Sequence, residues 1–164
     1  MLRFSKKADY ALIAVKDLAS RPEGTSSSAR EIAERYDIPT ELMAKVLQRL
    51  AKINVVASHH GTQGGYRLVR AAGQISIADI IQAIDGPVLV TACSDEDETC
   101  EQYAKCNVRD PLWRLKDRIV QALASFSVDE LVADSDGIKG RPVPLTVTRR
   151  PVESIVPTQA TVDQ

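Results

Sequence analysis

A short helix, a proline break, a second helix and a glycine-rich turn follow one another between residues 28 and 65, and this order restricts the chain to few folds. Ser28 and Glu31 have the spacing of a capping box, which predicts a helix start. Asp37-Ile38-Pro39 ends that helix, because proline is excluded from a helix interior. Thr40 then begins another helix, with apolar residues at helical spacing. Two helices joined by so short a connection predict a helix-turn-helix.

Segments on either side complete the predicted domain. Ser5 can cap a preceding helix that runs to about Ser20. Residues 55–60 and 66–69 read as two strands, and the glycines between them favour a tight turn. Three helices followed by a β-hairpin predict a winged helix. The expected fold class is therefore mainly α with a small β-hairpin.

This domain offers two surfaces for double-stranded DNA. The polar face of the helix that begins at Thr40 is expected to enter the major groove, and the hairpin tip is expected to reach the minor groove. Ordinary solvated helices also have a polar face, so this feature alone also fits a helix without a ligand. The expected major-groove residues are Thr40, Glu41, Lys45, Gln48 and Arg49, and the expected minor-groove residues are His60, Gly61, Thr62 and Gln63.

Net charge differs between the two parts of the chain. Residues 1–70 contain 12 Lys and Arg against 7 Asp and Glu, whereas the remaining residues contain 9 against 15. The basic first part favours a polyanionic partner. Solvated faces that merely happen to differ in charge are the alternative.

A long amphipathic helix is predicted near residue 110, after a helix framed by Ser76 and Asp79. Asp110-Pro111 predicts a capping residue followed by proline at the first helical position. The remaining chain offers little to cover the apolar stripe of this helix, so the expected partner is a second copy of the chain. The stripe consists of Leu112, Leu115, Ile119, Ala122, Leu123 and Phe126.

All the cysteines of the chain, Cys93, Cys100 and Cys106, lie in one hydrophilic segment. Acidic residues stand among them, and core packing explains thiols in such a setting poorly. Thiolates select zinc, copper(I) or iron-sulfur clusters, and the lack of a C-x-x-C pair argues against the common zinc spacing. The residues alone favour a metal or cluster, with redox thiols or inert cysteines as alternatives.

Several other classes of protein are not expected. Lys16 and Asp17 interrupt the early apolar stretch, so we expect neither a signal peptide nor a membrane span. The expected location is therefore the cytoplasm. No nucleophile–base pattern or phosphate-binding loop occurs, so no enzyme activity is expected. Ser127 and Glu130 cap a short final helix, after which a Pro-rich tail is expected to be disordered.

A combination of short motifs runs through the first 133 residues. It consists of Ser5-Lys6 with Asp9-Tyr10-Ala11, Ile38-Pro39 before Leu47 and Leu50, Gly61-Thr62-Gln63-Gly64-Gly65-Tyr66 in the wing, Ala83-Ile84-Asp85, and the three cysteines followed by Leu112-Trp113. Together these motifs resemble the Rrf-type family of iron-sulfur winged-helix transcription regulators, which includes IscR, NsrR and RirA.

The resemblance implies a homodimeric regulator whose affinity for a DNA operator is set by an iron-sulfur cluster, either 2Fe-2S or 4Fe-4S. The implied ligands are the three cysteines and, as in nitric-oxide-sensing relatives, Asp9 from the opposite subunit. Without the resemblance, a carboxylate such as Asp9 in a first helical turn is simply a partner for the helix dipole. The chain departs from some members at Arg109, where they have a histidine ligand, and from many at His60, where they have an arginine.

These expectations divide the chain into segments. They are a DNA-binding winged helix-turn-helix domain at 1–72, a connecting helix and linker at 73–92, a cluster-binding loop at 93–106, a dimerisation helix with a short terminal helix at 107–134, and the tail at 135–164. The implied signal is iron-sulfur status, nitric oxide, redox state or iron. The alternative function is a metal- or cluster-binding protein that uses its winged helix for protein contacts without reading DNA.

Overall fold

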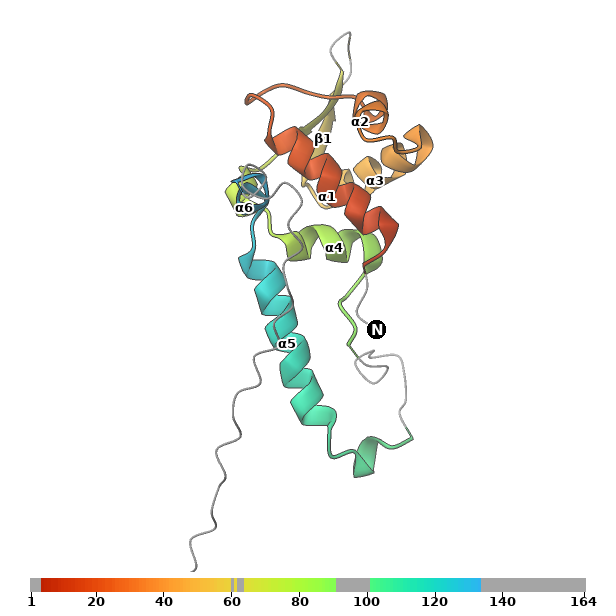
Figure 1. Ribbon diagram of the computed structural model, residues 1–164, viewed down its shortest axis with the longest axis vertical. Helices are drawn as coiled ribbons and strands as arrows, with labels where there is room; N and C mark the ends of the chain where they lie inside the picture. The colour runs from red at the N-terminus through yellow and green to blue at the C-terminus, as the bar shows by residue number, and fades with distance from the viewer. Residues whose placement is uncertain (1–3, 60, 62–63, 91–100, 134–164) are drawn as a thin grey trace, which may run out of the picture.

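The computed structural model describes residues 4–59, 61, 64–90 and 101–133, which form a winged helix with a long helix extending from it (Figure 1). The elements in chain order are α1 (Lys6–Ala19), α2 (Ala29–Arg35), α3 (Thr40–Lys52), β1 (Val56–His59), β2 (Gly65–Leu68), the 3-10 turn η1 (Ala72–Gln74), α4 (Ile77–Asp85), the 3-10 turn η3 (Tyr103–Lys105), α5 (Arg109–Ser125) and α6 (Val128–Ala133). Helices α1, α3 and α4 pack on one another around a common core. The predicted class, mainly α with a β-hairpin, is confirmed.

Helix α1 begins at its predicted cap, because the Ser5 hydroxyl accepts a hydrogen bond from the Ala8 amide. Its inner face combines alanines with Val15 and Leu18. Ser5 also donates its amide hydrogen, over 2.8 Å, and its hydroxyl hydrogen to the carboxylate of Asp85 at the end of α4. These bonds fix the start of α1 to the end of α4.

A buried carboxylate holds the other end of α1 against α2. Asp17 is 4% exposed and accepts hydrogen bonds from Arg21, Arg35 and Tyr36. The two arginines compensate its charge, as burial of a carboxylate requires. Burial and the negative charge of Asp17 raise the pKa of the Tyr36 hydroxyl above its ordinary value.

Helices α2 and α3 form the predicted helix-turn-helix. Both halves of the Ser28–Glu31 capping box are present, and Glu31 also accepts a hydrogen bond from the Ser27 hydroxyl. The bond from the Ser28 backbone amide is the main reason why the pKa of Glu31 is lowered. Asp37 has a positive φ of 52° at the turn, and Ile38 after it is buried.

The apolar stripe of α3 forms the centre of the core. Met43, Val46, Leu47 and Leu50 are at most 2% exposed, whereas Leu42, on the edge of the stripe, is half-buried. Helices α1, α2 and α4 all pack against α3. The opposite face of α3 is left to solvent.

The wing is an antiparallel hairpin whose register runs from Val56 opposite Leu68 to His59 opposite Gly65. A further backbone bridge joins Ser27, just before α2, to Tyr66. A Cβ atom at Gly65 would lie 2.5 Å from the carbonyl carbon of Ser27, so this close approach requires glycine. The bridge fixes the base of the wing to the start of the helix-turn-helix.

Helix α4 has the predicted start and stop. Ser76 and Asp79 form a complete capping box, and the isoleucines of the helix face the core. The helix ends at Gly86, which adopts a φ of 84° that favours glycine. The chain then leads toward the cysteine segment.

Helix α5 starts two residues earlier than predicted. Arg109 is the first helical residue, and the residue before it makes no side-chain cap, so the prediction that Asp110 caps this helix is wrong. The Asp110 carboxylate instead pairs with Arg109 Nε at 2.8 Å. Pro111 lies in the first turn, where an absent amide hydrogen breaks no intrahelical bond.

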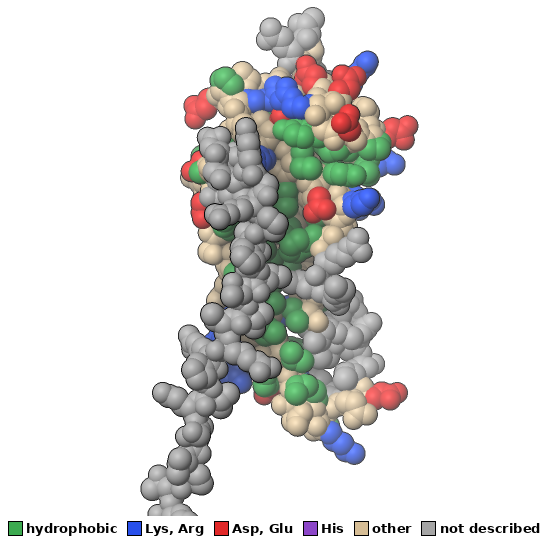
Figure 2. All heavy atoms as spheres, viewed as in Figure 1, with side chains coloured by type: hydrophobic (Ala, Val, Ile, Leu, Met, Phe, Trp, Pro, Cys, Tyr) green, Lys and Arg blue, Asp and Glu red, His purple; other side chains and the backbone are tan. Residues whose placement is uncertain are grey.

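In the described single chain, no residue of α5 is buried. Leu123 and Phe126 near its end pack against the core, whereas Trp113 and Leu115 near its start are 49% and 45% exposed. Figure 2 shows hydrophobic side chains along this helix in the lower part of the molecule. The stripe thus lacks a full cover, as expected from the sequence.

The C-terminal end of α5 is held against the winged helix by backbone hydrogen bonds and by α6. Ser127 and Glu130 form the predicted cap of α6. The Ile77 amide donates to the Phe126 carbonyl, and the Val128 amide donates to the Ile75 carbonyl, each at 2.9 Å. Within the described ranges, none of the helices is long and apolar enough to cross a membrane.

Candidate nucleic-acid interface and cysteine segment

Four of the residues expected in the major groove share the face of α3 that points away from the core, and Thr40 is the first residue of the helix. All of them are exposed, and the buried stripe around Leu47 occupies the opposite face. Hydroxyl, carboxylate, amide and cationic side chains on one exposed helix face can contact base edges and phosphates. The residues are Thr40, Glu41, Lys45, Gln48 and Arg49.

Arg49 makes a contact that the sequence did not predict. Its Nη1 donates to the carbonyl oxygen of Ile84 at 2.7 Å, in the last turn of α4. A carbonyl in a last helical turn has no partner within its own helix, so Arg49 satisfies it. A guanidinium has five N–H donors, and the others are left for a phosphate or a base.

The tip of the wing is described in part. Gly61 is exposed and has a φ of 130°. A Cβ atom at Gly64 would lie 2.7 Å from the carbonyl oxygen of His59, so the turn requires glycine there. The other predicted minor-groove residues, His60, Thr62 and Gln63, lie outside the described residues.

The cysteine segment is also described in part. Cys106 follows the turn η3, is half-buried and has a free thiol, whereas Cys93 and Cys100 lie outside the described residues. Among the residues that are described, no group of three or more His, Cys, Asp or Glu side chains could hold a metal ion. An unpaired thiol next to the start of α5 is a suitable donor for zinc, copper(I) or iron-sulfur iron.

Asp9 lies in the first turn of α1 and is exposed. Its amide donates to the Ser5 carbonyl at 3.1 Å, while its carboxylate makes no hydrogen bond or ion pair within the described part of the chain. The position suits a partner for the helix dipole and equally leaves the carboxylate accessible to an external ligand. Ser5, in turn, is bonded to Asp85.

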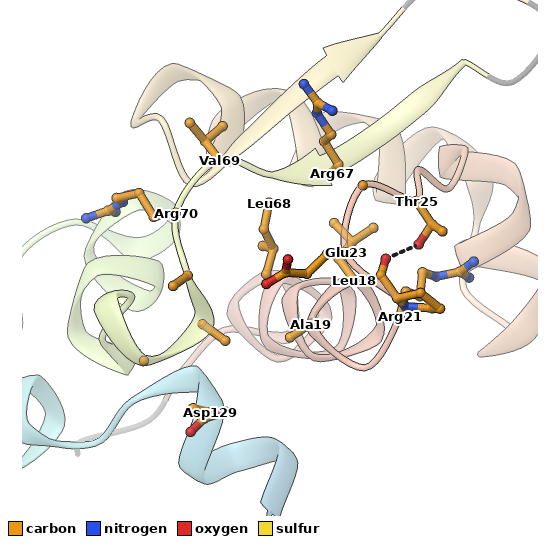
Figure 3. Close-up of a pocket in the computed structure, with 15 residues that line it drawn as sticks. Leu18, Ala19, Arg21, Glu23, Thr25, Arg67, Leu68, Val69, Arg70 and Asp129 are labelled. Atoms are coloured by element: carbon orange, nitrogen blue, oxygen red, sulfur yellow. Dashed lines mark hydrogen bonds between the residues drawn. The ribbon is translucent and has the colours of Figure 1, made fainter.

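A cavity of about 660 Å³ opens between the end of α1, the segment after β2 and α6 (Figure 3). Arg21, Arg67 and Arg70 line it, but Figure 3 shows their guanidinium groups pointing in different directions. They therefore do not converge on one anion. The hydrogen bond drawn beside the cavity, from Thr25 Oγ1 to the Pro22 carbonyl at 2.7 Å, closes the local loop.

An exposed polar helix beside a hairpin, on a helix-turn-helix, defines a winged-helix DNA-binding protein. The Rrf2 family profile, described as an iron-dependent transcriptional regulator, matches residues 4–134. The chain belongs to the Rrf2 family of transcription regulators. This family is not one of enzymes, in agreement with the sequence analysis.

Individual relatives agree with this assignment. The HTH-type transcriptional regulator IscR of Xenorhabdus nematophila is 35% identical over 136 residues, which cover 82% of each chain. The solved structure of CymR, the global cysteine regulator of B. subtilis, has a TM-score of 0.68 at 28% identity and covers 83% of this chain and 100% of that chain. T. potens IscR has a TM-score of 0.64 at 26% identity and covers 85% and 94%. The predicted family and winged-helix fold are confirmed.

Proposed function

We propose that this chain forms a homodimer that binds double-stranded DNA with an affinity set by an iron-sulfur cluster. The observation that carries the proposal is the position of the last turn of α4. This turn contacts the reading helix through Arg49 and the first helix through Ser5, and the chain continues from it into the cysteine segment. A change in the cysteine segment has a short physical route to both helices.

The DNA contacts are assigned to two surfaces. Thr40, Glu41, Lys45, Gln48 and Arg49 would read the major groove, and the wing from His60 to Gln63 would reach the minor groove of a pseudo-palindromic operator. The bridge from Ser27 to Tyr66 supports this assignment, because it gives the wing a fixed position relative to the helix-turn-helix. Residues 1–72 would form this DNA-binding domain.

The cluster would be held by Cys93, Cys100, Cys106 and Asp9 of the partner copy. The free thiol of Cys106 and the exposed carboxylate of Asp9 fit such a ligand set, since thiolates are strong iron ligands and a carboxylate oxygen is a weaker, more exchangeable one. When bound, a 2Fe-2S or 4Fe-4S group supplies a centre that reacts with oxidants or nitric oxide. The protein would work in the cytoplasm.

Asp9, Ser5 and Asp85 connect this site to the reading helix. Asp9 and Ser5 belong to the start of α1, and the Asp85 carboxylate that Ser5 contacts follows Ile84, the partner of Arg49. A pull on Asp9 would therefore shift the end of α4 and the orientation of Arg49. Because Asp9 would come from the other subunit, the site is incomplete without the dimer formed through α5.

DNA binding is tested by titrating a fluorescent duplex, selected from a random pool with the wild-type protein, at several salt concentrations. Lys45→Ala and Arg49→Ala should each weaken binding by about 1–3 kcal/mol if they contact bases, with a smaller loss for Gln63→Ala in the wing. Lys16→Ala, in the last turn of α1 and not among the proposed contact residues, is the control. Unchanged affinity for the duplex in all three variants would mean that the winged helix does not contact the DNA. Salt-independent binding would favour the protein-contact alternative.

Cluster binding is tested on anaerobically purified protein by absorption spectroscopy with iron and sulfide counts. Replacement of Cys93, Cys100 or Cys106 by alanine should abolish the cluster signal. Asp9→Ala should leave a cluster that assembles but decays faster and responds differently to nitric oxide. Asp129→Ala, which removes an acidic residue from the first turn of α6, is the matched control. Identical decay in Asp9→Ala and wild type would return Asp9 to a helix-dipole role.

A further inference from the structure

Side chains from three helices meet in a groove of about 230 Å³ beside the reading helix. The start of α1 contributes Lys7, the end of α4 contributes Ile84, and α3 contributes the rest. All the charged residues that line the groove are cationic: Lys7, Lys45, Arg49 and Lys52. The groove therefore has the electrostatic character of an anion site.

The groove has an apolar floor and a basic rim. Leu42, Val46 and Ile84 supply the apolar lining. A charge beside such a low-dielectric wall attracts an anion more strongly than the same charge surrounded by water. Arg49 is held in place by its bond to the Ile84 carbonyl, so less side-chain freedom is lost when it contacts a ligand.

Two carboxylates lie close to the groove without lining it. Glu41 is exposed on α3, four residues before Lys45, and Asp85 follows Ile84. The Asp85 carboxylate accepts both hydrogen bonds from Ser5, which occupies it on the α1 side. Neither residue is among those that line the groove, so the balance inside it is positive.

We infer that this groove binds a backbone phosphate of the DNA, with Lys7 as a phosphate contact supplied by α1. The inference rests on the proposed DNA binding and extends its contact surface to a helix outside the helix-turn-helix. A volume of about 230 Å³ is below the ~300–1,000 Å³ usual for small-molecule sites but accommodates a phosphate group. Lys45 and Gln48 line this protein groove and also belong to the face of α3 that is proposed to enter the DNA major groove. The DNA backbone at the edge of the major groove would therefore pass beside the protein groove.

Lys7→Ala and Lys6→Ala form a matched pair of variants. Both residues are exposed lysines in the first turn of α1, and only Lys7 lines the groove. Affinity for the selected duplex and for a mixed-sequence duplex is measured between about 50 and 200 mM salt. Lys7→Ala should weaken binding to both duplexes by a similar factor and reduce the slope of log K against log salt by about 0.9 per groove. Lys7→Arg should retain the slope.

Three results would overturn the inference. The first is a slope for Lys7→Ala that equals that of wild type, and the second is an equal change in Lys6→Ala, which would reflect net charge alone. The third is binding of inorganic phosphate that Lys7→Ala abolishes while DNA binding stays intact, which would make the groove a free-anion site. Circular dichroism and thermal melting verify that each variant is folded. Loss of salt dependence in the wild type itself would instead overturn the proposed DNA binding.

Discussion

Helices α3 and α5 have the same kind of amphipathic pattern, but the single chain treats them in opposite ways. The stripe of α3 is closed off by α1, α2 and α4, and Met43, Leu47 and Leu50 are fully buried. Helix α5 has no buried residue, and Leu115 remains 45% exposed. A periodic apolar stripe therefore indicates that a face needs a cover, and the surrounding chain decides whether that cover is intramolecular.

This difference in burial means that α3 contributes to the folding stability of a single chain, whereas α5 is expected to contribute to the stability of an assembly. Burial in α3 stabilises the fold of each chain, whereas an apolar face on α5 stabilises an assembly once a second copy covers it. Changes in α3 should act on unfolding at any protein concentration. Changes on the α5 face should act in a concentration-dependent way.

The largest effect is expected from Leu47→Ala, which removes a fully buried side chain from the stripe of α3. The free energy of unfolding should fall by about 2–5 kcal/mol, because a cavity remains in a closed core. Urea unfolding of wild type and variant at two protein concentrations measures the change. Leu115→Ala is the companion variant on α5, and it should cost less and depend on concentration. If both variants lose the same free energy of unfolding at both protein concentrations, the proposed difference between α3 and α5 is wrong.

The next effect concerns assembly rather than folding. Leu115→Asp or Ile119→Asp should convert dimers to monomers, because a charge in an apolar interface is costly to desolvate. Sedimentation at low micromolar concentration gives the mass. Ala124→Asp is the control, since it makes the same neutral-to-acidic change on the opposite, exposed side of α5. If Leu115→Asp stays dimeric, the copies meet through another surface.

A smaller effect is expected at the junction of α1 with α4, which connects the two regions. Ser5→Ala removes the cap of α1 and the hydroxyl bond to Asp85 but keeps the bond from the backbone amide, and it should lower the free energy of unfolding by about 1–2 kcal/mol. Asp85→Ala removes only the interhelical bonds and should cost less. Ser20→Ala, at the other end of α1, is the control in thermal melting. An equal loss of stability in Ser20→Ala would mean that the contact between Ser5 and Asp85 does not stabilise the fold more than an ordinary hydrogen bond at a helix end.

The smallest effect is a pH dependence at the start of the helix-turn-helix. Because the pKa of Glu31 is lowered in the folded chain, its stabilising contribution is present above the ordinary carboxyl value and is lost as pH falls through the folded value. Glu31→Gln can keep the capping box but does not titrate. The variant should therefore lose less stability than wild type as pH falls below the ordinary carboxyl value. Parallel acid unfolding curves would contradict this.

Much of the fold could be predicted because its determinants are local. The capping boxes at Ser28 and Ser76 join residues three apart, and the stripe of α3 follows from helical periodicity. The start of α5 was misplaced by two residues, because Asp110-Pro111 fits the pattern of a cap followed by the first helical residue, whereas the observed helix begins at Arg109. The exposed face of α3 was predicted equally well, since it is the complement of the buried stripe.

The sequence by itself thus determined the helices, the wing and the residues that α3 leaves exposed, since each depends on neighbours within a few positions along the chain. Only the tertiary structure decided that Arg49 contacts Ile84, that Ser5 contacts Asp85, and that Lys7 joins the groove of the reading helix. These pairs are 35 or more residues apart in the chain. Such contacts arise from how α1, α3 and α4 cross in the core, and periodicity carries no information about the partner that a side chain meets across that crossing.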